Sequence, residues 1–80
     1  MGYAQYMVGH YPDAERYLAR ATELHGTPDE FYYLGLAQEK QDKLEGARAA
    51  LEQAIKLDPG HSEAQRRLAE LRQRIHGERH

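Results

Sequence analysis

The chain has 80 residues, with 11 basic and 13 acidic side chains, five histidines and no cysteine, and its formal net charge is −2 at pH 7. A domain of this length buries only about 60% of the surface that its unfolded chain exposes. Without cysteine it has neither a disulfide nor a thiolate metal site to compensate for a small core. The near-neutral charge argues against a domain built mainly to grip the phosphates of nucleic acid.

No run of eighteen apolar residues occurs, which excludes a membrane-spanning helix. The first twenty residues also lack the basic start and apolar block of a secretory signal. We expect a soluble, cytoplasmic protein, whether the chain is complete or a piece of a longer one.

Residues 1–8 form the first apolar helical element, with Tyr3, Ala4, Met7 and Val8, before a turn at residues 9–11. An isolated helix this short is marginal in water. Either the chain starts inside a longer array of helices, or a second copy covers this end, as an isologous dimer or a swapped helix would. We expect a homodimer formed through this element.

A second helix follows up to Leu24, with Ala14, Leu18 and Ala21 at three- and four-residue spacing. The next helix has a strong start signal, because Thr27 can cap it, Pro28 takes its first position, and Glu30 can bond back to the cap. It ends near residues 41–43.

The following helix runs from about Leu44 to Leu57, and the Asp-Pro-Gly sequence at 58–60 ends it. Ser62 and Gln65 then have the spacing of a capping box, which predicts a last helix from about Ser62 to Ile75. Gly77 and the polar tail are expected to fray.

These helices belong to an internal repeat. Gly2, Ala4, Ala14, Leu18, Ala21 and Leu24 each recur 33 residues later, and a third copy begins at Ser62. We therefore divide the single domain into a truncated first repeat (1–27), a full repeat (28–61), a C-terminal capping helix (62–76) and a frayed tail (77–80). Gly35 and Ala54 have almost no side chain, so their helices are expected to approach closely.

The full repeat carries a set of regularly spaced residues: Phe31, Leu34, Gly35 and Gln38, then Ala47, Leu51 and Ala54, and finally Pro59. Their spacing resembles the tetratricopeptide repeat pattern. Departures are Gln5 and Gln38, where the family usually has tyrosine, and a loop at 25–28 that is about one residue short. The resemblance implies an all-α fold of antiparallel helix pairs, stacked as a short right-handed solenoid of about five helices.

The resemblance also implies that the first helix of each pair lines a concave groove for ligand peptides. By alignment with the family, the groove positions are Tyr3, Tyr6 and Met7 in the first copy, Tyr32, Leu36, Glu39 and Lys40 in the second, and Arg66, Glu70, Gln73 and Arg74 in the third.

Tyrosine and arginine give large contact areas with a polar handle, which favours a partner peptide or helix with apolar and acidic groups. We expect a protein-interaction module, part of a larger adaptor or assembly factor. The plainer alternative is that Tyr6, Tyr32 and Tyr33 cover the core and the arginines are a solvated face. Some family members clamp a chaperone's carboxylate tail, but here Tyr3 and Leu36 stand at the asparagine positions, so that ligand is not expected.

A rival function is structural self-association, in which the aromatic patch is used up by a second copy. A weaker third is contact with an anionic polymer through Arg66, Arg67, Arg72 and Arg74, which would weaken steeply with salt. No enzyme is expected, because no nucleophile lies beside a base in the pattern. No cofactor or metal is expected either, since only His76 and His80 have helical ligand spacing.

Overall fold

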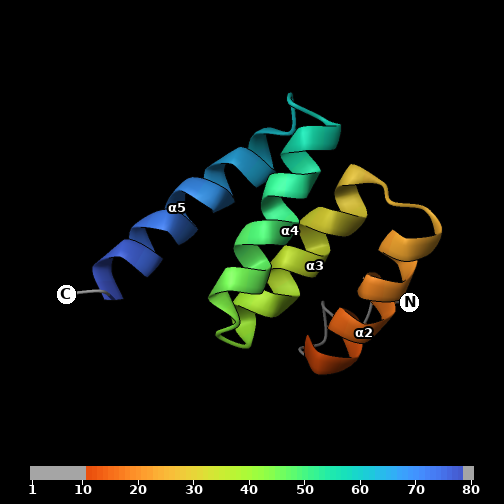
Figure 1. The fold of residues 1–80 in the computed structure, drawn as a ribbon, viewed down its shortest axis with the longest axis horizontal. Helices are drawn as coiled ribbons and strands as arrows, with labels where there is room; N and C mark the ends of the chain where they lie inside the picture. Colours follow the sequence, from red (N-terminus) through yellow and green to blue (C-terminus); the bar gives the residue numbers. More distant parts are fainter. Residues whose placement is uncertain (1–10, 79–80) are drawn as a thin grey trace.

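The computed structural model describes residues 11–78. These residues form four helices and no strand: α2 (Tyr11–Leu24), α3 (Pro28–Lys40), α4 (Leu44–Leu57) and α5 (Ser62–Glu78). Each helix packs against the preceding one, and Figure 1 shows them side by side in chain order, from α2 in orange to α5 in blue. The all-helical repeat fold predicted from the sequence is confirmed. The expected first helix, over residues 1–8, lies outside the described residues.

The start of α3 is the predicted capping box. The Glu30 N–H donates to Thr27 Oγ1 at 3.3 Å, and the Thr27 N–H donates to Glu30 Oε1 at 3.0 Å, with Pro28 at the first helical position. The helix ends at a tight turn in which Asp42 has φ 64°, and the Lys43 N–H returns to the Gln38 carbonyl at 2.9 Å. This turn brings α4 back antiparallel to α3.

The small residue Gly35 sets the distance between α3 and α4. A Cβ atom added there would lie 2.9 Å from Leu51 Cγ and 3.2 Å from the Ala47 carbonyl oxygen. Real side chains do not approach this closely, so only glycine fits at this separation. Ala54 is also fully buried. The close approach predicted from the repeated small residues is therefore confirmed.

The core consists of two clusters that share α4. One joins α4 to α5 and the other joins α2, α3 and α4, so each helix pair buries its apolar stripe against the next. The first cluster contains Ala47, Leu51, Ala54, Ala64, Leu68 and Leu71, and the second contains Ala14, Leu18, Leu34, Ala37 and Ala50. Within residues 11–78, the buried side chains of both clusters are alanine and leucine, and partly buried aromatic and isoleucine side chains pack against them.

The start of α5 differs from the prediction. Ser62 is the first helical residue, and the capping side chain belongs to His61, whose Nδ1 accepts from the Ala64 N–H at 3.1 Å. The Gln65 side chain bonds to the Pro59 carbonyl and does not return to the cap. The predicted Ser-x-x-Gln capping box is therefore wrong by one residue. At its other end α5 continues to Glu78, beyond the predicted Ile75.

A polar network joins α2 to α3 and the turn after it. Glu15 accepts from Lys43 Nζ at 2.8 Å, from the Gln41 amide at 2.8 Å and from the Gln38 amide at 3.2 Å. Burial alone would raise the pKa of Glu15, but these hydrogen bonds and the charge of Lys43 outweigh it and lower the pKa. Gln38, where the tetratricopeptide pattern usually has tyrosine, thus serves as a polar link between helices.

Candidate functional site

Two predicted groove residues from the second copy and two from the third meet in a hollow between α3 and α5. We call it the α3–α5 hollow; its volume is about 360 Å³. Its lining is Tyr32 and Leu36 from α3, and Glu63, Arg66, Arg67 and Glu70 from α5. Four of these six are residues that the sequence assigned to the groove. The repeat brings them together because α3 and α5 are first helices of successive pairs, with α4 packed between them along the chain.

The α3 side of the hollow is aromatic and aliphatic. The Tyr32 ring contacts the Tyr33 ring edge-on, with centroids 5.2 Å apart, and lies 5.0 Å from the His61 ring. Leu36 is only 4% exposed. Leu36 is therefore a buried packing residue that reaches the hollow, and its loss would damage the fold as well as the site.

Ion pairs span the gap between α3 and α5 beside the hollow. The Glu39 side chain, 13% exposed, lies 3.9 Å from Arg67 Nε and 3.7 Å from Arg74 Nη1. These distances are too long for hydrogen bonds, and Glu39 Oε1 is buried without one among the described residues. Shorter bonds join Arg67 to Glu70 at 3.3 Å and Arg74 to Asp42 at 2.7 Å. These ion pairs bridge α3 and α5 in addition to the packing of Phe31 and Tyr32 against the α4–α5 cluster.

These pairs favour the charged form of Arg67. Burial alone would lower the pKa of its guanidinium, but the hydrogen bond with Glu70 and the charge of Glu39 raise it. The Arg67 guanidinium is thus paired with two carboxylates of this chain, Glu39 and Glu70.

Arg66 differs from the other arginines of α5. Arg67 and Arg74 pair with α3 or its turn, and Arg72 lies 3.4 Å from Glu52 of α4. Within residues 11–78, Arg66 is exposed and has no ion pair or hydrogen bond. Because three of the four arginines are paired, a cationic strip for an anionic polymer is not favoured.

The remaining predicted groove residues do not line the hollow. Lys40 and Gln73 are exposed, and neither belongs to its lining. Tyr3, Tyr6 and Met7 lie outside the described residues. Glu63, which lines the hollow, and His61, which lies beside it, were not predicted from the sequence. Glu63 lies three residues before Arg66, so helical spacing places both on one side of α5 and could have indicated it.

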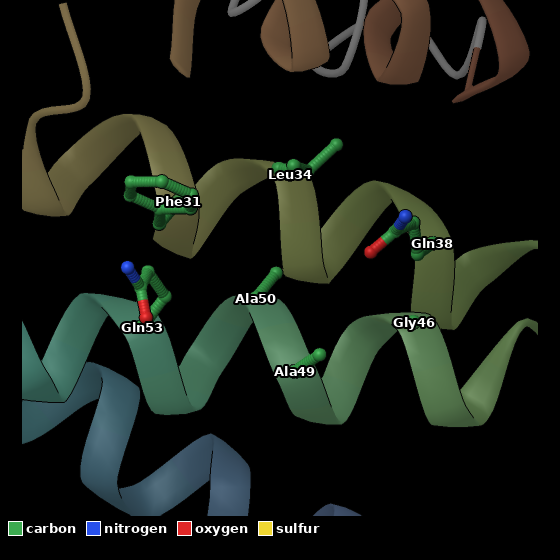
Figure 2. A pocket seen from close by; sticks show the side chains of 7 residues that line it. All are labelled: Phe31, Leu34, Gln38, Gly46, Ala49, Ala50 and Gln53. Atoms are coloured by element: carbon green, nitrogen blue, oxygen red, sulfur yellow. The ribbon is translucent and has the colours of Figure 1, made fainter. Parts of the chain in front are cut away.

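Figure 2 shows a second hollow, which follows the line of contact between α3 and α4. Leu34 and Ala50 are buried core residues, and the Gln38 amide packs 3.1 Å from the position of a Cβ on Gly46. Its lining has no charged side chain; it is Phe31, Leu34, Gln38, Gly46, Ala49, Ala50 and Gln53. With no charge to select a partner, this seam is a weaker candidate than the α3–α5 hollow.

Two absences hold for the part of the chain that is described. No helix there is long and apolar enough to cross a membrane. No group of three or more histidine, aspartate or glutamate side chains there is arranged to hold a metal ion.

Comparison with known proteins agrees with the geometry. The family model described as tetratricopeptide repeat matches residues 1–60 and, in an overlapping second match, residues 32–72. No curated relative matches the chain. The two matches together cover most of the 80 residues and include every described helix at least in part. The chain therefore belongs to the tetratricopeptide repeat family, whose members generally mediate protein–protein interactions and are typically not catalytic.

Proposed function

We propose that the α3–α5 hollow binds a peptide or helix of a partner protein, and that the chain serves as an adaptor or assembly module in the cytoplasm. The observation that carries this proposal is the juxtaposition of Tyr32 and Leu36 with the unpaired Arg66. An aromatic and aliphatic wall suits an apolar side chain of the partner, and aromatic residues and arginine are enriched at binding hot spots.

Arg66 defines the charge of the partner. Its neighbours Arg67 and Arg74 are bound to carboxylates of this chain, whereas Arg66 has none within residues 11–78. Glu63 and Glu70 lie one turn away on the same helix, so they moderate the positive charge without closing the site. The partner is therefore expected to carry an acidic group next to its apolar segment.

The test uses two pools of short fluorescent peptides. In the first, a leucine, phenylalanine or tyrosine is flanked by aspartate or glutamate; in the second, lysine replaces the acids. Wild-type protein should bind the acidic pool. The Arg66→Glu variant should bind it at least tenfold more weakly, equivalent to about 1.4 kcal/mol, because it leaves the peptide's acid facing a like charge.

Arg48→Glu is the matched control, since it makes the same change of net charge on the outer side of α4. Among residues 11–78, Arg48 pairs only with Glu45 of its own helix, at 2.7 Å. Its reversal should leave peptide affinity within twofold of wild type. If Arg66→Glu and Arg48→Glu lose the same affinity, the loss comes from the change of net charge, which would contradict the proposed site.

We propose self-association as the alternative function. Tyr17 and Leu24 are seven residues apart on α2, on one side of the helix, and are 46% and 72% exposed. A second copy could cover them. Sedimentation at high micromolar concentration should then show a dimer that Leu24→Lys disrupts; a wild-type monomer under those conditions removes this alternative.

A further inference from the structure

His61 lies beside the α3–α5 hollow and contacts both α3 and α5. It precedes α5, and its side chain is only 8% exposed. Nδ1 accepts from the Ala64 N–H in the first turn of α5 at 3.1 Å, and Nε2 lies 3.0 Å from Asp29 Oδ1 in the first turn of α3. Its ring also lies against Tyr32, with centroids 5.0 Å apart. One imidazole therefore connects α3, α5 and the aromatic wall.

These bonds select one form of the ring. The Ala64 N–H can only donate, so Nδ1 must present a lone pair and carry no proton. In the neutral ring the proton then sits on Nε2, where it donates to the Asp29 carboxylate. The geometry requires the uncharged Nε2–H tautomer.

Building on the binding function proposed above, we propose that His61 is a positioning residue for the hollow. In its neutral Nε2–H form it fixes the first turn of α5 against Tyr32, so that a partner binds most tightly when His61 is uncharged. Protonation of this ring loosens the site.

The direction in which protonation of His61 changes partner binding follows from the bonds of its two ring nitrogens. A proton added at Nδ1 turns an acceptor into a donor that faces the Ala64 N–H, so α5 loses its cap. A positive charge at the start of a helix is also unfavourable with the helix dipole.

Other groups around the His61 ring offset the loss of the α5 cap only in part. The bond from Nε2 to Asp29 persists in the charged form and becomes charge-assisted, but the Asp29 side chain is 79% exposed, so water weakens it. Tyr32 faces the ring from α3. Asp58 lies in the preceding turn, where its carbonyl accepts from the His61 N–H at 3.0 Å, and Glu63 is two residues further along the chain in the first turn of α5. The cap is therefore the bond that protonation removes.

The first measurement needs no ligand. Long-range ¹H–¹⁵N spectra of the full chain report which ring nitrogen carries a proton, and we expect Nε2–H at about pH 8. As the pH falls to about 5, the Ala64 amide should shift and its hydrogen exchange should quicken roughly fivefold, as for loss of one N-cap. A proton on Nδ1 at pH 8 would overturn the assignment.

Two variants connect the ring to binding. His61→Asn retains a side-chain acceptor for the cap but cannot take up a proton. As the pH falls, its affinity for the acidic peptide pool should therefore weaken only because the peptides' own acids become protonated. His61→Phe retains an aromatic ring beside Tyr32 without the cap, and should bind several-fold more weakly at both pH values. Wild type should lose roughly fivefold more affinity than His61→Asn between pH 8 and 5.

His25→Asn is the control, because His25 also pairs with a carboxylate, Glu30 at 3.2 Å, but caps no helix. Its pH profile should match that of wild type. If His61→Asn also keeps the wild-type profile, His61 does not position the site. If wild type binds no peptide at any pH, the proposed function fails, while the ring spectra and the Ala64 amide still decide the role of His61.

Discussion

Helix α3 has two neighbours that it meets by different physical means. Toward α4 it presents Gly35, and the backbones approach until no Cβ atom fits between them. Toward α5 it presents Tyr32, Leu36 and Glu39, and the gap is bridged by ion pairs and contains a hollow. The same helix is therefore closed by packing on one side and left open on the other.

This difference separates stability from recognition. Buried apolar atoms contribute most of the stability of a small domain, whereas exposed ion pairs contribute little. Changes along α3–α4 should therefore alter the free energy of unfolding. Changes to the charges along α3–α5 should alter binding with little effect on folding.

The largest effect is expected for Leu51→Ala. Leu51 is fully buried between α3 and α5 and fills the space around Gly35. Truncation leaves a cavity and should lower the free energy of unfolding by about 2–5 kcal/mol in urea denaturation followed by circular dichroism. Leu57→Ala, the same change at a half-exposed position of α4, should cost less than about 1 kcal/mol. Equal losses of unfolding free energy in Leu51→Ala and Leu57→Ala would contradict the assignment of Leu51 to the core.

Gly35→Ala tests the close packing of α3 against α4. Alanine favours a helix by about 1 kcal/mol, but its Cβ would clash with Leu51 and the Ala47 carbonyl, so a net loss of about 1–2 kcal/mol is expected. In the Leu51→Ala background this loss should fall by at least half, because the clashing side chain is gone. Gly77→Ala is the control, since a Cβ there meets nothing within 4 Å and should not destabilise. Additive losses would contradict the packing described.

Glu15→Gln tests the polar link between α2 and α3. The folded state lowers the pKa of Glu15, so its contribution is present above its ordinary value of 4.5 and is lost as the pH falls through the folded value. Glutamine should cost about 1 kcal/mol near pH 7, and the cost should shrink as the pH falls below 4.5. A stability difference that does not change with pH would assign the effect to packing instead of charge.

The smallest effect is expected for Arg74→Ala. Its partners Glu39 and Asp42 lie across the α3–α5 gap, but the arginine is 44% exposed. Unfolding free energy should fall by about 0.5 kcal/mol or less, and added salt should remove the difference. A loss comparable to that of Leu51→Ala would mean that charge, and not packing, connects α3 to α5 with substantial energy.

Much of this fold could be predicted because its signals are local or periodic. The capping box at Thr27, the bounds of α4 and the close approach at Gly35 each depend on residue types at fixed spacing. The meeting of Tyr32 with Arg66 also followed, because the repeat places first helices in equivalent positions.

The rest depends on contacts between side chains distant in sequence. The burial of Leu36 could not be predicted, since exposure at a groove position depends on how closely the neighbouring helices approach. Which arginine stays unpaired depends on the spatial positions of Glu39, Asp42 and Glu52. His61 replaced Ser62 as the cap because its ring also bonds to Asp29, 32 residues earlier.

The most direct test of this separation is to map peptide binding on the chain by backbone amide shifts. With the acidic peptide pool, the largest changes should fall on the amides of Tyr32, Arg66 and Glu70, around the α3–α5 hollow. The chemical shifts of the Ala49 and Gln53 amides, in the seam between α3 and α4, should not change. Changes concentrated at that seam, or none at Arg66, would show that the open side of α3 is not where a partner binds.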